Sequence, residues 1–157
     1  MPFWNIYHPE SAFSTADEKS AFVADITNYY SGKGSLPPIY VVVNFIMLPA
    51  GNIFRAYKPI SELDKPFIRL QISHIAVHVK DWQESKGGGL DEDAAHAKFR
   101  AGIDGAIQKS IVDKGYYYEY SVTEESRGMW MIDGFQPPPW LSEGEKKWRE
   151  AGKAVPY

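Results

Sequence analysis

A chain of 157 residues, 44% of them hydrophobic and 24% charged, is long enough to bury a core and is predicted to form one globular domain. Its formal net charge of −3 gives no electrostatic basis for binding nucleic acid or an anionic membrane, and the absence of cysteine excludes disulfides, thiolate chemistry and Cys-based zinc sites. No apolar run approaches the roughly 18 residues of a membrane span, and the first residues lack the pattern of a signal peptide. We therefore expect a cytoplasmic protein with no nucleic-acid or membrane partner and no cofactor.

The chain opens with "MPFWNIYHPE", in which "FWNIY" is aromatic and β-branched and predicts a first strand. Pro2 fits the first position of a strand, because proline has a fixed φ and no N–H to donate. A second interpretation starts from Met1, which processing enzymes commonly remove when a small residue follows. Removal would leave Pro2 as a free secondary amine able to do acid–base chemistry. Retention of Met1 would leave an amide with no usable lone pair.

A capped helix is predicted within residues 9–34, "PESAFSTADEKSAFVADITNYYSGKG". Ser14 or Thr15 can act as its N-cap, with acidic residues in the favourable first turn, and Gly32 and Gly34 are expected to end it. Apolar side chains at helical spacing predict its buried face: Ala21, Phe22, Ile26 and Tyr29 or Tyr30.

The middle of the chain predicts two strands. An apolar strand at about Ile39 to Met47 is closed by a turn at 49–51 and followed by an irregular stretch at 53–66. A long strand is then predicted at 66–79, in "PFIRLQISHIAVHV", and the glycines of "DWQESKGGGLDED" predict a loop at 81–93.

The remaining elements repeat the order of the first half. A helix is predicted in residues 91–115 and a last strand in "YYYEYSV", residues 116–122. The inward face of this helix is expected to carry Ala95, Phe99, Ile103, Ile107 and Ile111. The tail has a proline-rich arm and is expected to form a short helix at 142–150.

The element order is therefore β-α-β followed by β-α-β, at about residues 2–58 and 66–125, with a C-terminal arm at about 126–157. Each crossover should join parallel strands and place its helix on the same face of one four-stranded sheet, which defines an α+β fold. The apolar strands predict that the second face is buried as well, most simply against other subunits. An oligomer is expected from this pattern alone.

His74 and His78 lie four residues apart, a spacing that would suit a shared metal ion on a helix. Their surroundings predict a strand, in which both would point to one face with their Cα atoms roughly 13 Å apart. They are therefore expected to be packed or pocket-lining histidines, and no metal site is predicted.

Several polar residues interrupt the predicted strands. Arg69 is either an edge residue in solvent or a buried carboxylate binder, and Glu119 is either a base with a raised pKa or the partner of an arginine. Asn44 must be hydrogen-bonded if buried, which makes it a substrate-positioning group or a structural bridge. Tyr30 and Tyr120 could supply phenolic donors to an anionic intermediate.

Several segments together resemble the tautomerase superfamily, and within it the cis-3-chloroacrylic acid dehalogenase-like group with its fungal tautomerase-like members. They are "MPFWNIYHPE", "ADITNYYSG", "VNFIMLPAGNIF", "PFIRLQISHIAVHV" and "GFQPPP", which span residues 2 to about 139. The pattern VNFxxxPAGNxF is the most specific of them.

The resemblance implies homotrimers of β-α-β-β-α-β subunits, with an amino-terminal proline at the floor of each active site. In such a site the neutral proline is a general base, and the cationic proline is a general acid for hydration-type chemistry. Burial and nearby positive charge lower the pKa of an amine, so one group can take either role. Pro2 matches this catalytic proline, and Tyr120 matches a tyrosine in the last strand.

Other positions depart from the group that the chain resembles. Tyr30 stands where that group has a histidine in the first helix, and "QISHIAVH" contains neither of its two carboxylate-binding arginines. Its water-activating glutamate has no counterpart beyond the poorly placed Asp133. Tautomerisation is therefore expected over hydration or dehalogenation. The expected replacement anion binders are Arg69, His74 and, from a neighbouring subunit, Arg127.

The sequence thus predicts a homotrimeric tautomerase-like enzyme in which Pro2 moves protons next to the carbonyl of a small, acidic substrate. Tyr120, Tyr30 and His74 are expected to polarise the carbonyl oxygen, and Arg69 is expected to anchor the anion. Two alternatives stay open. One is a dimeric, ferredoxin-like α+β barrel that binds small molecules or acts as a monooxygenase, and the other is a non-catalytic oligomer that has kept the fold and lost the chemistry.

Overall fold

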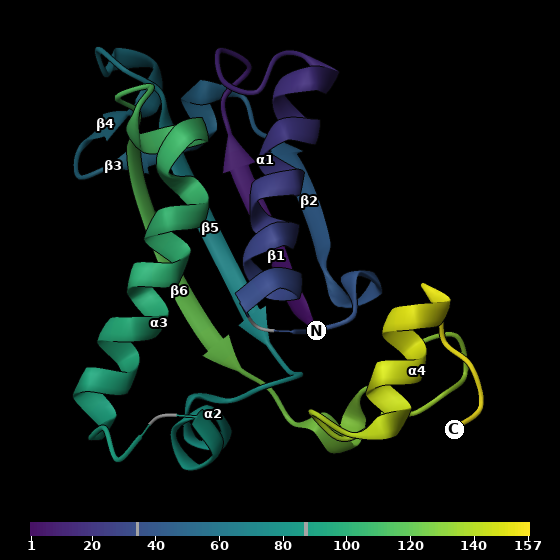
Figure 1. The fold of residues 1–157 in the computed structure, drawn as a ribbon. Helices are drawn as coiled ribbons and strands as arrows, with labels where there is room; N and C mark the ends of the chain where they lie inside the picture. The colour runs from purple at the N-terminus through teal and green to yellow at the C-terminus, as the bar shows by residue number, and fades with distance from the viewer. Residues whose placement is uncertain (34, 87) are drawn as a thin grey trace.

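A four-stranded sheet forms the centre of the computed structural model, which describes residues 1–33, 35–86 and 88–157 (Figure 1). The strands lie in the order β2-β1-β5-β6. Their bounds are Pro2–His8 for β1, Val42–Met47 for β2, Phe67–His74 for β5 and Tyr117–Glu124 for β6. β1 pairs in parallel with β2 and antiparallel with β5, and β5 pairs in parallel with β6. The predicted α+β sheet is confirmed.

The direct pairing of β1 with β2 distinguishes this sheet from a ferredoxin-like one. In the split β-α-β unit of ferredoxin-like order, another strand lies between the two strands that the helix connects. Here β1 is in register with β2 from Phe3 opposite Val42 to His8 opposite Met47. The ferredoxin-like alternative is therefore wrong for this chain.

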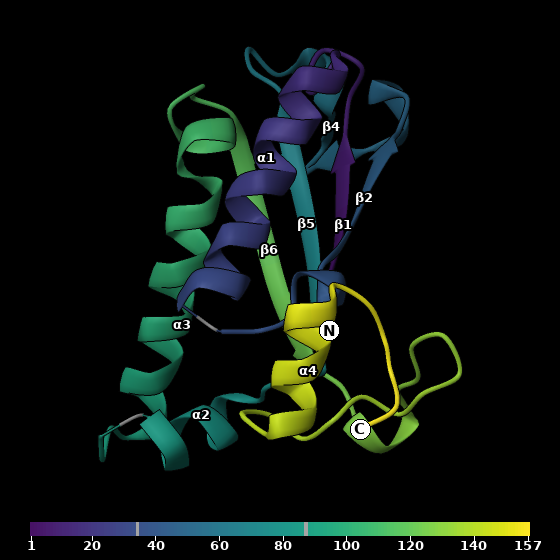
Figure 2. The same ribbon diagram turned by 45° about the vertical axis from the view of Figure 1, so that its right-hand side comes forward.

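Two helices, α1 (Ala16–Asn28) and α3 (Glu92–Ile107), cover one face of the sheet (Figures 1 and 2). Thr15 caps α1, because its hydroxyl accepts the N–H of Glu18 while the Glu18 carboxylate accepts the N–H of Thr15. The helix ends in a π-helical turn, Tyr29–Lys33, which brings two tyrosines to the end of the sheet. None of the described helices is long and apolar enough to cross a membrane.

Alternate residues of β1 and β5 meet these helices in a hydrophobic core. Its largest fully buried side chains are Trp4, Trp148, Tyr40, Phe13, Phe22, Ile6, Ile26, Ile68, Leu70, Ile72, Ile103 and Ile107. Ala21, which the helical spacing predicts on the inward face of α1, is exposed instead. The inward positions predicted for α3 are buried, with Phe99 partly so.

The opposite face of the sheet is mostly polar, although Phe3 and Val42 also lie on it, and its burial against other subunits stays a prediction. Its cross-strand hydrogen bonds join Tyr7 to Gln71, Asn44 to Asn5, Arg69 to Ser121, and Ser73 to Thr123. The strands look apolar in the sequence because every second residue belongs to the core on the helix side. Most of the polar residues between them point to the other side, whereas His8 and His74 point to the helix side and are buried.

The segment after β5 differs from its prediction. β5 ends at His74 rather than at residue 79, and α2 (Val79–Lys86) occupies the first part of the predicted loop, residues 81–86. The start of this helix is held by a side chain that is distant in sequence, because the Glu124 carboxylate accepts the N–H of Val79 at 2.5 Å. Gly87, the first glycine of the predicted loop, lies outside the described residues.

Two smaller differences concern the middle of the chain. β2 begins at Val42 rather than near Ile39, because Pro38–Tyr40 forms a 3₁₀ turn. The stretch predicted to be irregular contains a short hairpin, with β3 (Phe54–Arg55) paired to β4 (Lys58–Pro59).

The C-terminal arm lies beside the end of the sheet at which the chain begins (Figures 1 and 2). Its helix α4 (Glu143–Ala151) confirms the short helix predicted at 142–150. The Arg127 guanidinium donates to the carbonyl of Ala76 after β5 and, at 2.7 Å, to the carbonyl of Pro138 in the arm. Arg127 thereby fastens the arm to the segment that follows β5.

Candidate active site

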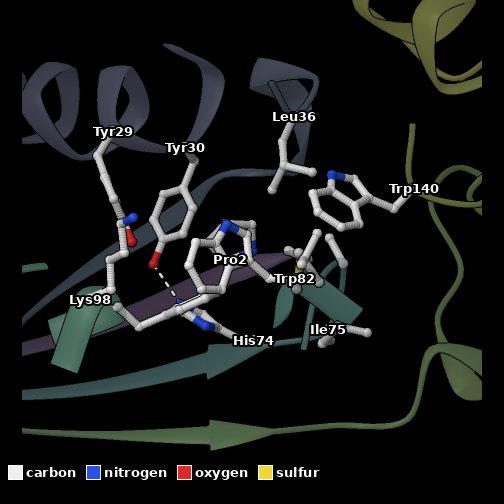
Figure 3. A pocket seen from close by; sticks show the side chains of 13 residues that line it. Pro2, Tyr29, Tyr30, Leu36, His74, Ile75, Trp82, Lys98 and Trp140 are labelled. Atoms are coloured by element: carbon white, nitrogen blue, oxygen red, sulfur yellow. Dashed lines mark hydrogen bonds between the residues drawn. The ribbon is translucent and has the colours of Figure 1, made fainter. Parts of the chain in front are cut away.

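A cavity of about 140 Å³ opens beside the start of β1 (Figure 3). Both halves of the chain and the C-terminal arm contribute to its lining: Met1, Pro2, Tyr29, Tyr30, Leu36, His74, Ile75, Ala76, Val77, Trp82, Lys98, Phe99 and Trp140. Three residues predicted from the sequence as catalytic, Pro2, Tyr30 and His74, are brought together here. The lining is mostly apolar, and electrostatic interactions of polar groups are stronger in such surroundings than in water.

Pro2 is buried at the first position of β1, opposite His74 of β5 in the antiparallel pairing. Met1 precedes it, and the Met1 carbonyl accepts the N–H of Ile75 at 3.1 Å. With Met1 in place the Pro2 nitrogen is part of an amide. Any acid–base use of Pro2 therefore requires the loss of Met1.

The surroundings of the amino terminus favour the neutral form of the Met1 amine. Burial lowers the pKa of the Met1 amine from 8.0 to about 4, and the Arg127 cation acts in the same direction. The carboxylates of Glu145 and Glu125 oppose this shift but do not cancel it. Burial penalises the charged form of an amine, so the Met1 amine keeps its lone pair at neutral pH.

Tyr30 and His74 form a hydrogen-bonded pair in the wall of the cavity. Tyr30 Oη lies 2.6 Å from His74 Nε2, and Trp4 Nε1 donates to the same oxygen at 3.2 Å. Burial lowers the pKa of His74 from 6.5 to about 4, and the neighbouring amine and His78 add to this. Burial also raises the pKa of Tyr30 well above its usual value, so both groups are neutral at pH 7.

The Tyr29 ring packs against Gly102 of α3 and lines the cavity. A Cβ at Gly102 would collide with the Tyr29 ring, so glycine at this position of α3 is what admits the tyrosine. Burial raises the pKa of Tyr29 to about 12. Its phenol therefore stays protonated beside the cavity.

Lys98 and Trp82 line the cavity although the sequence gives no signal for either. Lys98 Nζ lies 5.5 Å from the centre of the Trp82 ring, a cation–π distance. Among the described residues, Lys98 is the only lysine or arginine along the cavity. The sequence pattern misses both because it predicts a loop where α2 packs Trp82 against α3. The cavity thus has one cation available for a substrate anion.

Arg69, Glu119 and Asn44 lie on the polar face of the sheet and do not line the cavity. Side chains alternate along a strand, so Arg69 and His74 of β5 point to opposite faces. Arg69 forms an ion pair with Glu119 at 3.7 Å and donates to Ser121 at 2.8 Å. Within this chain the carboxylate that Arg69 binds belongs to Glu119.

Tyr120 and Arg127 also lie apart from Pro2 in this chain. Tyr120 donates to Asp104 of α3 at 3.0 Å, and burial raises its pKa to about 12. It lines a neighbouring cleft of about 480 Å³ that shares His74 with the cavity. The Arg127 guanidinium donates to two backbone carbonyls. Its effect on the cavity is electrostatic, because its charge lowers the pKa of the Met1 amine.

His78 lies beyond the end of β5, so the predicted placement of His74 and His78 on one strand face is wrong. Its Nε2 is 2.8 Å from the carbonyl oxygen of Glu125. In the part of the chain that the structure describes, no three histidine, aspartate or glutamate side chains gather in a way that could hold a metal ion.

Comparison with known proteins adds to this geometry. The model of the Tautomerase_3 family, described as "Putative oxalocrotonate tautomerase enzyme", matches residues 1–153. The structure of RhCC from Rhodococcus jostii RHA1 is similar, with 28% identity and a TM-score of 0.83 over 99% of each chain. A probable enzyme from the thermophilic fungus Aspergillus fumigatus is 34% identical, with a TM-score of 0.78 over 100% of this chain and 98% of that one. No curated protein matches the sequence.

A fused 4-OT that forms a symmetric trimer shares the fold, with 12% identity and a TM-score of 0.60 over 85% of this chain and 94% of that one. The predicted resemblance to the tautomerase superfamily is confirmed by the family model and by these structural neighbours. The chain belongs to the Tautomerase_3 family.

Proposed function

We propose that this chain is a tautomerase whose general base is the free amine of Pro2, formed when Met1 is removed. The observation that carries the proposal is the position of Pro2, buried in the cavity wall at an end of the chain where burial and Arg127 lower the pKa of an amine. A neutral amine in a dry site can accept a proton near neutral pH and return it.

The proposed reaction interconverts an enol and its keto form. Pro2 accepts the proton of the enol hydroxyl while the oxygen re-forms its double bond to carbon. The electron pair of the carbon–carbon double bond moves to the neighbouring carbon, which takes the proton back from the pyrrolidinium. The proton is conserved over the cycle, so the balance requires no cofactor.

The cavity favours a small, flat, acidic substrate. Tyr29, Trp82 and Trp140 provide aromatic surfaces for a planar, conjugated body. Lys98 provides a cation for a carboxylate, which is the role predicted for Arg69 from the sequence. We therefore assign the anion to Lys98, because Arg69 lies on the other face of the sheet.

The lining also favours tautomerisation over hydration or dehalogenation. Adding water to an unsaturated acid requires a group that activates the water molecule. None of the described lining residues is an aspartate or glutamate, and Asp133, the nearest sequence candidate, is exposed on the arm. The resemblance to the cis-3-chloroacrylic acid dehalogenase-like group therefore supports the proline base and not a hydrolytic step.

We also propose that the active form is a homotrimer. The fused 4-OT structure is a trimer of the same fold, and the outer edges of β2 and β6 have no partner strand within the described residues. Light scattering of the processed protein should give the mass of three chains. A mass of one or two chains would contradict this part of the proposal.

The proposed base is tested by covalent labelling of the natively processed protein. The reagent is 2-oxo-3-pentynoate, which inactivates Pt0534, a protein of the same fold. Intact mass should show loss of Met1 and one label, peptide mapping should place the label on Pro2, and ketonisation of an acidic enol should stop in parallel.

The matched control carries a glutamate inserted between Met1 and Pro2, which blocks removal of the methionine. It should keep Met1, take no label on Pro2 and show no ketonisation. A processed protein without a Pro2 label, or a control that is as active as the processed form, would overturn the proposal.

A further inference from the structure

We propose that Tyr30, oriented by Trp4, fixes His74 as the tautomer that carries its proton on Nδ1, so that His74 donates a hydrogen bond to the substrate oxygen. This inference rests on the proposed function, because it names the partner of Pro2 in the same cavity. Trp4 does not line the cavity, so both it and Tyr30 are positioning residues that act through His74.

The donors and acceptors of the three side chains fix the direction of both hydrogen bonds. The indole N–H can only donate, so Tyr30 Oη accepts from Trp4 at 3.2 Å. The hydroxyl hydrogen of Tyr30 then needs its own acceptor, and His74 Nε2 lies 2.6 Å away. Nε2 must be unprotonated to accept it, which leaves the proton of the neutral imidazole on Nδ1.

Trp4 matters because a phenol hydroxyl keeps its hydrogen close to the plane of the ring, on one side or the other. The Trp4 N–H approaches the oxygen and disfavours the orientation in which the two hydrogens would meet. The remaining orientation points the hydroxyl at His74. Tyr30 meets Trp4 and His74 edge to face, at interplanar angles of 81° and 89°.

Burial makes this arrangement hard to replace. The exposed fractions are 0% for Trp4, 6% for Tyr30 and 4% for His74, so both bonds are shielded from bulk water. The opposite tautomer would place a second donor against the Tyr30 oxygen and leave the hydroxyl hydrogen without a partner in the dry interior. A buried donor without a partner is strongly unfavourable.

The charge states agree with the hydrogen-bond directions. Burial raises the pKa of Tyr30 well above its usual value, so the phenol keeps the hydrogen that it donates. Burial, helped by the chain-terminal amine and His78, lowers the pKa of His74 to about 4, so the imidazole is neutral in the working range. The chain-terminal amine faces His74 from the start of β1, Tyr30 faces it from the turn after α1, and His78 faces it from the segment after β5.

His74 is placed to act on the same substrate as Pro2. The two residues lie opposite each other in the antiparallel pair, on the face that the helices cover. Directly opposed side chains have Cβ atoms about 5 Å apart. Figure 3 shows Pro2 and His74 side by side, with the Tyr30 hydroxyl joined to the imidazole.

The chemical role that follows is that of a neutral electrophile. As Pro2 removes a proton, charge develops on the substrate oxygen, and a preorganised N–H donor stabilises that charge. His74 keeps its own proton throughout, so Pro2 alone carries the transferred proton. A neutral imidazole suits this role because it does not protonate the enolate oxygen outright.

Nitrogen-15 NMR of the processed, histidine-labelled protein tests the tautomer without substrate, because protonated and unprotonated ring nitrogens have well-separated shifts. His74 should show a protonated Nδ1 and an unprotonated Nε2. Tyr30→Phe removes only the hydroxyl, and we expect it to move His74 toward the Nε2-protonated form. Its kcat should fall about tenfold to a hundredfold, with KM within about twofold of the parent value.

The matched control is Tyr29→Phe, which removes the hydroxyl of the adjacent tyrosine in the same cavity and should leave the His74 tautomer unchanged. Trp4→Phe should give a mixture of tautomers, because the Tyr30 hydroxyl becomes free to turn. An Nε2-protonated His74 in the parent, or an unchanged spectrum in Tyr30→Phe, would overturn the inference. Failure of Pro2 labelling would instead remove the proposed function, because the NMR result does not depend on activity.

Discussion

At the scale of the single residue, strand face decides which polar groups can take part in the chemistry. His74 and Arg69 belong to the same strand, yet His74 faces the cavity and Arg69 faces Glu119 on the polar side of the sheet. An odd separation along a strand puts two side chains on opposite faces. Lys98 reaches the cavity from α3, whereas Arg69 lies on the other face of the sheet and does not line it.

Replacing Lys98 by glutamine tests the assigned anion contact. We expect KM for an acidic enol to rise about tenfold with kcat within about twofold, because a charge-assisted contact worth about 1.4 kcal/mol is lost. Steady-state kinetics with the acid and with its methyl ester provide the measurement. The ester should not distinguish the variant from the parent, and an equal loss with both substrates would contradict the assignment.

Arg69→Gln is the matched substitution on the other face. It should leave KM for the same acid unchanged, because Arg69 is occupied by Glu119 and Ser121. Its free energy of unfolding should fall by no more than about 1 kcal/mol, since the ion pair is partly exposed. A raised KM would mean that Arg69 reaches the active site of a neighbouring subunit.

At the scale of the element, the two ends of α1 have different roles: the start stabilises the helix, and the far end leads to the cavity. Its start is fixed by the reciprocal hydrogen bonds of Thr15 and Glu18. Its far end continues into the π-helical turn that carries Tyr29 and Tyr30 to the cavity. The stability of α1 therefore supports the placement of the group that holds His74.

Removing the cap tests the structural end alone. Thr15→Ala should lower the free energy of unfolding by about 1 kcal/mol, because the N–H of Glu18 loses its acceptor and the reciprocal bond is weakened. Urea denaturation measures the loss. Ser14→Ala is the control and should change stability by less than half as much, because the Ser14 hydroxyl bonds only to the Glu18 side chain, at 3.4 Å. Equal losses in the two variants would contradict the capping assignment.

At the scale of the whole molecule, burial of the site couples its protonation to folding. His74 has a pKa of about 4 in the folded protein against 6.5 when unperturbed, so the unfolded chain binds more protons between these values. Stability from this group is full above pH 6.5 and is lost as the pH falls toward 4. The loss amounts to roughly 3 kcal/mol for a shift of this size.

The pH dependence is measured by urea denaturation at a series of pH values between 7 and 4. The parent should lose stability steadily over this range. His74→Gln removes the titrating ring and should have a shallower slope, whatever its stability at pH 7. Parallel slopes in the two proteins would show that His74 does not titrate with the expected shift.

Local patterns in the sequence determined the elements and their order. Aromatic and β-branched runs predicted the strands, helical spacing predicted α1 and α3, and Thr15 was one of two caps that local chemistry allowed. The choice of Pro2, Tyr30 and His74 as candidate catalytic residues also followed from residue type and from the family resemblance. These features depend on a few neighbouring residues, which a sequence displays directly.

Contacts between distant residues decided the rest. α2 forms in the segment before the glycines, which was predicted as strand end and loop. Glu124 of β6 holds its first turn, and the helix places Trp82 against Lys98. The direction of the hydrogen bond between Tyr30 and His74 depends on Trp4, a residue of another strand. The sequence by itself determined the four strands of the central sheet and the helices α1, α3 and α4, since backbone propensity is local. Only the tertiary structure decided which polar side chains share the cavity, because strand register, helix placement and burial arise when the segments pack together.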